Sequence, residues 1–308
     1  MTKRRLGRTE LFIDPLVFGC NVLGWTLEES AAHTVLDAFV GEGLTAFDTA
    51  DSYGKGKSET ILGNWIKARG NRDKVLVFTK VGSDMGQGHR DLSAKWIEAE
   101  VDASLKRLQT DYIDLYQTHW PDPNTPQEET LAALDRVVKA GKVRYIGSSN
   151  QDTALLTEAL AISKANGFAR YETIQNEFNL YDRAGFEQVQ ATCVKEEVSG
   201  IGYFSLARGF LSGKYRTPAD AQKSPRGQAV VDKYFNPKGF RILDALDAVG
   251  KRTGASAAEV NLAWIAAQPA VGAPIASATS VEQVQSLARG ARLTLSADDL
   301  AALTDAGK

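Results

Sequence analysis

Residues 45–53 read TAFDTADSY, and this stretch is the most informative one about the fold. Its first part is apolar without strict alternation, which is typical of a parallel strand covered on both faces. Asp48 and Tyr53 follow directly. Polar side chains just past the carboxyl end of a buried parallel strand are typical of active sites in (β/α)8 barrels.

Two later stretches repeat this arrangement. Residues 75–80 read VLVFTK and end in Lys80, and residues 112–119 read YIDLYQTH and end in His119. If the three strands belong to one barrel, the same mouth contains four different groups. They are the carboxylate of Asp48, the phenol of Tyr53, the amine of Lys80 and the imidazole of His119.

Short strand-like runs alternate with longer amphipathic ones along the whole chain. The eight predicted strands are residues 16–20, 45–50, 75–80, 112–119, 143–150, 171–178, 201–207 and 271–278. Most intervals show helical periodicity, and no linker divides them. The sequence therefore predicts an α/β protein, a single TIM barrel domain over residues 1–308.

Helix start signals support this reading. Ser93 and Asp152 are predicted N-caps, and Thr125, Pro126 and Glu128 predict a capping box with proline in the first turn. A helix after each strand returns the chain to the start of the next parallel strand.

Two segments fall outside the repeat. Residues 1–15 predict a short hairpin that plugs the bottom of the barrel. Residues 208–238, rich in Gly, Pro, Lys and Arg, predict a long loop after the seventh strand. A loop of this length is usually functional or flexible.

The composition limits the possible partners. The chain has 36 Lys and Arg against 38 Asp and Glu, and this balance does not indicate nucleic acid or an anionic membrane as a partner. No stretch approaches a membrane span or a signal peptide, so we expect a cytoplasmic protein. Cys20, Cys193 and the three histidines show no metal-binding spacing, and no metal is expected.

The four polar side chains together predict a proton donor. A phenol titrates at about pH 10, and a nearby ammonium lowers that pKa. Lys80 would tune Tyr53 in this way, and Asp48 would keep Lys80 charged. His119 would orient a substrate oxygen by a hydrogen bond. Such a set protonates a developing alkoxide, so it requires a partner that delivers hydride to the carbonyl carbon.

Several segments carry a family resemblance. They are LGRTELFIDPLVFGC, FDTADSYGKGKSETILG, FTKVG, DYIDLYQTHWPD, KVRYIGSSN, IQNEFN and SLARGFLSGKY. Through them the chain resembles the aldo-keto reductase superfamily over essentially its whole length. The resemblance implies a barrel that binds a nicotinamide cofactor without a Rossmann domain and reduces small aldehydes or ketones. It implies Asp48, Tyr53, Lys80 and His119 as the catalytic tetrad, with Tyr53 as the general acid.

The resemblance also implies where NADP(H) binds. Ser149, Asn150 and Gln175 would hold the nicotinamide carboxamide, although Ser and Asn are also ordinary turn residues. Tyr203 would stack on the ring. The loops after the last two strands and the helix beginning near Ser280 would hold the phosphates. The full predicted set is Gly19, Cys20, Asn21, Asp48, Ser149, Asn150, Gln175, Tyr203, Phe204, Ser205, Leu206, Arg208, Gly209, Leu211, Gly213, Lys214, Ser277, Thr279 and Gln283.

Two positions depart from the family pattern. Many members have a serine where this chain has Phe204, which offers no hydroxyl. Many also have an arginine that binds the 2′-phosphate of NADP where this chain has Thr279. Lys214, Arg216 or Arg208 would have to compensate, so NAD(H) stays possible.

The predicted substrate pocket is aromatic around one polar corner. Trp25 and Trp120 would line it with Tyr53 and His119, which suits a small carbonyl compound. Two other functions stay open: a cofactor-sensing regulatory subunit with little turnover, and a barrel hydrolase or lyase that uses carboxylates alone. The natural substrate, the physiological direction and the oligomeric state are not predicted.

Overall fold

The computed structural model describes residues 2–308, and its centre is a closed barrel of eight parallel strands. Neighbours in the barrel follow the chain order, and the last strand pairs with the first through Ile275 and Val17. The strands are β3 (Val17–Gly19), β4 (Ala46–Asp48), β5 (Leu76–Val81), β6 (Ile113–Thr118), β7 (Val143–Ser149), β8 (Tyr171–Gln175), β9 (Ser199–Gly202) and β10 (Val271–Ala276). The predicted TIM barrel is confirmed.

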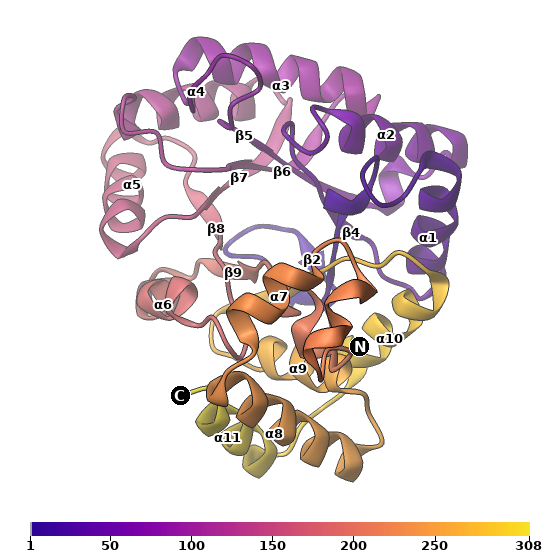
Figure 1. Ribbon diagram of the computed structural model, residues 1–308. Helices are drawn as coiled ribbons and strands as arrows, with labels where there is room; N and C mark the ends of the chain where they lie inside the picture. The colour runs from indigo at the N-terminus through magenta and orange to yellow at the C-terminus, as the bar shows by residue number, and fades with distance from the viewer. Residues whose placement is uncertain (1) are drawn as a thin grey trace.

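Helices surround the strand ring on the outside (Figure 1). They are α1 (Glu29–Gly41), α2 (Lys57–Arg69), α3 (Ala94–Leu108), α4 (Gln127–Lys139), α5 (Thr153–Asn166), α6 (Ala184–Glu196), α8 (Pro237–Thr253), α9 (Ala257–Ala266), α10 (Val281–Arg292) and α11 (Ala297–Ala306). Apolar side chains fill the space between the helices and the strands, as where the Phe47 and Trp65 rings lie 5.3 Å apart. None of the helices in residues 2–308 has the length and apolar character needed to cross a membrane.

The predicted N-terminal hairpin is confirmed as β1 (Arg4–Arg5) paired antiparallel with β2 (Phe12–Ile13). Leu6, Leu11 and Ile13 are buried in the same apolar cluster as the inward side chains of the barrel strands. The hairpin therefore covers one end of the barrel, away from the carboxyl ends of the strands.

The predicted helix caps are confirmed at two positions and wrong at one. Ser93 accepts a hydrogen bond from the backbone of Trp96, and Asp152 caps α5 in the same way. Thr125 does not cap α4, because its hydroxyl donates to Asp122 at 2.7 Å. Pro126 occupies the N-cap position without a side-chain bond.

The segment between β9 and α8, predicted as a long loop, contains regular secondary structure. It contains η3 (Ala207–Ser212), η4 (Pro218–Lys223) and α7 (Gly227–Tyr234), all short. The predicted seventh strand also extended too far, since β9 ends at Gly202 and Tyr203 makes only an isolated bridge with Glu177.

Helices α2 and α3 pack closely behind the loop that carries Tyr53. A Cβ atom on Gly63 would lie 2.4 Å from the backbone oxygen of Arg107, so only glycine permits this approach. The Arg107 guanidinium donates to buried Glu59 at 2.6 Å, and Glu59 in turn accepts from Thr79 of β5 at 2.5 Å. This ion pair, buried at Glu59, links both helices to the barrel where the loop that carries Tyr53 ends.

Candidate active site

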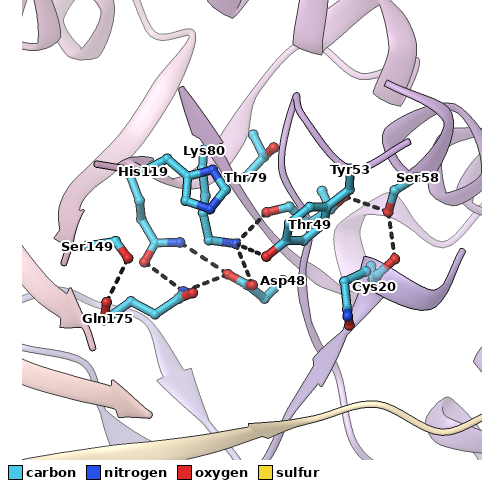
Figure 2. A network of polar contacts seen from close by, with 12 residues as sticks. Cys20, Asp48, Thr49, Tyr53, Ser58, Thr79, Lys80, His119, Ser149 and Gln175 are labelled. Carbon is cyan, nitrogen blue, oxygen red and sulfur yellow. Dashed lines mark hydrogen bonds and ion pairs between the residues drawn. The ribbon is translucent and has the colours of Figure 1, made fainter. Parts of the chain in front are cut away.

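Asp48 and Lys80 form a buried ion pair at the carboxyl ends of β4 and β5. The Lys80 ammonium donates to Asp48 Oδ2 at 2.6 Å and to the backbone oxygen of Thr49 at 2.7 Å. Burial by itself lowers the pKa of Lys80, but Asp48 and the Tyr53 hydroxyl outweigh this effect and raise it. Lys80 therefore stays charged. Figure 2 shows these side chains gathered with His119 and Gln175.

The second oxygen of Asp48 is held by two amides. Gln175 of β8 donates to Oδ1 at 2.9 Å, and Gln117 of β6 donates to it at 3.2 Å. Gln117 was not among the predicted site residues. The carboxylate thus has partners from β5, β6 and β8, which fixes its orientation across the barrel mouth.

Tyr53 lies beside the ion pair, with its hydroxyl 3.4 Å from Lys80 Nζ. The expected lowering of its pKa is wrong for the protein without ligand. Burial raises the pKa of Tyr53, the Lys80 ammonium opposes this, and the Asp48 carboxylate adds to the rise. Desolvation disfavours the phenolate more than one ammonium favours it. The phenol is therefore in its protonated form at neutral pH.

His119 follows β6 directly, and its backbone nitrogen donates to Val81 at 2.8 Å. Its ring meets the Tyr53 ring edge-on, at 5.9 Å between centroids, and stacks on Trp120 at 5.6 Å. Burial, Lys80 and Arg90 hold the pKa of His119 well below its usual value. The neutral form of the imidazole is therefore favoured at neutral pH.

A cavity of about 900 Å³ opens above these residues. Asp48, Tyr53 and His119 line it, whereas Lys80 lies beneath. Trp25 and Trp120, predicted to contact substrate, also line it. A volume near the upper end of the usual range for ligand sites accommodates a large ligand.

Most residues predicted to bind cofactor line this cavity. They are Gly19, Asn21, Asp48, Ser149, Asn150, Gln175, Tyr203, Phe204, Ser205, Leu206, Arg208, Gly209, Lys214, Ser277, Thr279 and Gln283. Three lie outside the lining. Cys20 directs its thiol to the backbone of Phe18, Leu211 packs in the apolar core, and Gly213 ends η3 facing Arg216.

One end of the cavity has the donors and the ring that suit a carboxamide-bearing heterocycle. Tyr203 donates to Asn150 Oδ1 at 2.7 Å, and the Asn150 amide donates to Ser149 Oγ at 3.0 Å. Asn150 has a φ of 57°, in the left-handed region that few non-glycine residues adopt. This backbone conformation sets the direction of its side-chain amide. The chemistry of this set fits a nicotinamide ring.

Another part of the cavity wall is basic. Arg208, Lys214, Lys223 and Arg226 line it, and Asp48 is the one carboxylate among the described lining residues. Lys223 pairs with Asp220 at 2.7 Å, whereas Arg208, Lys214 and Arg226 have no acidic partner within residues 2–308. Ser280 caps α10 at the same mouth, beside Thr279 and Gln283. This part of the wall fits phosphate groups, and Arg216, turned to Asp247 at 2.8 Å, does not contribute to it.

The part of the wall that comes from the end of η4 and the residues before α7 was not predicted from the sequence. Lys223, Ser224, Pro225 and Arg226 all line the cavity. The Arg226 guanidinium lies 4.4 Å from the centroid of the Trp25 ring, so the segment after β9 reaches across to the loop after β3. The only signal for this contact was the basic character of residues 208–238.

Comparison with known proteins agrees with this geometry. The family model described as "Aldo/keto reductase family" matches residues 15–308. The Aldo-keto reductase YhdN of Bacillus subtilis is 35% identical over 91% of this chain and 84% of its own length. The uncharacterized oxidoreductase YrpG of the same organism is 34% identical over 97% and 94%. A probable voltage-gated potassium channel subunit beta of Oryza sativa subsp. japonica is 31% identical over 92% and 89%.

The fold is a barrel of eight parallel strands with a polar site at one mouth. The chain belongs to the aldo/keto reductase family. Members of this family typically use a nicotinamide cofactor and act on small carbonyl compounds, and membership supports an oxidoreductase.

Proposed function

We propose that this protein is an NADP(H)-dependent reductase that converts an aldehyde or ketone to the alcohol, with Tyr53 as the general acid. The observation that carries the proposal is the position of the Tyr53 hydroxyl, 3.4 Å from the Lys80 ammonium, on a residue that lines the cavity beside His119. Burial raises the pKa of Tyr53, which favours the protonated phenol that an acid needs. A bound nicotinamide would supply hydride to the carbonyl carbon.

The residues of the chain have complementary roles in this reaction. His119 donates a hydrogen bond to the carbonyl oxygen and orients it. As negative charge develops on that oxygen, Tyr53 transfers its hydroxyl proton to it. The Lys80 ammonium, held by Asp48, stabilises the resulting phenolate. In the oxidative direction the phenolate takes the proton back from the alcohol.

We assign NADP(H) rather than NAD(H) because of the cations in the basic part of the cavity wall. The additional charge of a 2′-phosphate would be met by Arg208, Lys214 and Arg226. Their charge would substitute for the arginine that many family members have at the position of Thr279. The absence of a second carboxylate among the described lining residues disfavours a hydrolase or lyase that relies on a carboxylate pair.

The test is the substitution Tyr53→Phe, which removes the acidic proton and retains the ring. We expect NADPH affinity, measured by fluorescence titration, to stay unchanged. Turnover of a small aromatic aldehyde should fall by a factor of roughly 10² or more, the usual contribution of a general acid. Tyr112→Phe is the matched control, because Tyr112 lies under Arg72 at the start of β6, outside the cavity lining. Normal turnover by Tyr53→Phe would contradict the assignment.

The similarity to the rice channel subunit supports one alternative, a regulatory subunit that senses the cofactor. A complete tetrad argues against pure sensing, since binding does not require the acid. NADPH binding without NADPH oxidation across aldehydes, ketones and quinones would favour the sensor.

A further inference from the structure

The imidazole of His119 has two chemically different nitrogen atoms in this structure. Nδ1 faces two serine hydroxyls, with Ser83 Oγ at 2.9 Å and Ser52 Oγ at 3.4 Å. Nε2 has no hydrogen-bond partner within residues 2–308, and it is not among the fully buried polar atoms. Because His119 lines the cavity, Nε2 is the nitrogen that a ligand meets.

The backbone around Ser83 is fixed. Gly82, between β5 and Ser83, has a φ of 102°, and a Cβ atom there would lie 2.4 Å from a methyl of Leu92. The Ser83 backbone oxygen accepts from Gln87 at 3.1 Å. Ser83 is 8% exposed, and His119 Nδ1 is the only partner of its hydroxyl in the described part of the chain.

Only one arrangement of protons satisfies these groups. A neutral imidazole carries a single N–H, on either Nδ1 or Nε2. If Nδ1 carried it, Nδ1 would donate to Ser83, and the buried Ser83 hydroxyl hydrogen would have no acceptor among residues 2–308. If Nε2 carries it, Ser83 donates to Nδ1, and every buried donor is satisfied.

We propose that Ser83 is a positioning residue that holds His119 in the tautomer protonated at Nε2. His119 then presents a hydrogen-bond donor to the cavity, and a substrate must offer an acceptor such as a carbonyl oxygen. In the other tautomer the ring would turn a lone pair toward that oxygen and repel it. The catalytic consequence rests on the proposed function, whereas the tautomer does not.

The tautomer is measurable directly by long-range ¹H–¹⁵N NMR on protein labelled at histidine. The chain has only three histidines, and a His119→Asn variant assigns the signal. We expect Nε2 protonated and Nδ1 unprotonated in the wild type. Ser83→Ala should move both nitrogen shifts toward the other tautomer, and Ser83→Thr should restore them. Ser52→Ala, which removes the hydroxyl at 3.4 Å from the same nitrogen, is the matched control and should leave them in place.

Turnover provides a second readout. In Ser83→Ala we expect kcat for an aldehyde to fall by about tenfold with NADPH affinity unchanged, and Ser83→Thr to recover most of it. Protonated Nδ1 in the wild type, or nitrogen shifts that Ser83→Ala leaves unchanged, would overturn the proposal. If the wild type shows the expected tautomer yet turns over no carbonyl, the proposed function fails while the positioning by Ser83 stands.

Discussion

At the scale of single residues, the site places a buried ion pair, Asp48 and Lys80, beside the hydroxyl group of Tyr53. The Asp48–Lys80 pair is buried, and three further donors or acceptors hold it, so neither partner is free to act as the acid. Tyr53 sits at the edge of this pair and carries a proton that burial helps it retain. In the proposed reaction the Lys80 ammonium would act mainly after proton transfer, when it faces a phenolate.

The raised pKa of Tyr53 predicts opposite pH behaviour in the two directions. Reduction needs the protonated phenol, so kcat/KM for an aldehyde should stay flat from pH 6 to 9 and fall only near or above pH 10, the ordinary tyrosine value. Oxidation needs the phenolate, so its rate should rise up to about tenfold per pH unit over the same range. Steady-state pH profiles check this. A reductive profile that falls with a pKa near neutrality would contradict it.

Site residues could be predicted from the sequence only where they directly follow a predicted strand. The positions after three strands marked Asp48, Tyr53, Lys80 and His119, and the structure brings all four together. Nothing local distinguished Asp48 from Asp51, which instead lies buried near Glu59, a setting that raises the pKa of Asp51 to about 8. Gln117 and Ser83 were missed because an amide inside a strand and a serine in a loop have no specific pattern.

At the scale of elements, the barrel strands were predictable and the segment after β9 was not. The strands are apolar runs buried on both faces, a signal that does not depend on distant residues. The short helices η4 and α7 form in residues 208–238 against partners far along the chain, such as Asp182, which accepts from Lys233 at 2.9 Å. Composition indicated a long loop, and tertiary contacts decided its structure.

This segment predicts a matched pair of arginine variants. Arg226→Ala removes a cavity cation that also stacks on Trp25, so the Kd for NADPH should rise by roughly tenfold or more, the usual effect of losing a charged hydrogen bond. Arg216→Ala changes the same segment, but it removes a guanidinium that is paired with Asp247 outside the cavity. Fluorescence titration of this variant should show an unchanged Kd for NADPH. Equal effects of the two substitutions would contradict a specific role for Arg226.

At the scale of the whole molecule, the closed barrel explains how residues distant in sequence form one site. Asp48 and Gln175 are 127 positions apart, yet the barrel brings their side chains to 2.9 Å. The N-terminal hairpin covers the opposite end. The four predicted catalytic residues and a set of cations therefore lie at one mouth, an arrangement that suits the proposed anionic cofactor.

In the proposed reaction, hydride passes to a carbonyl carbon at this mouth from a nicotinamide ring that is held with one face toward the substrate. The most direct measurement uses NADPH deuterated at C4 on one face or on the other, with 4-nitrobenzaldehyde and mass spectrometry of the alcohol. We expect deuterium on the carbinol carbon from one of the two labelled cofactors and none from the other. No deuterium from either cofactor, or equal transfer from both, would contradict it.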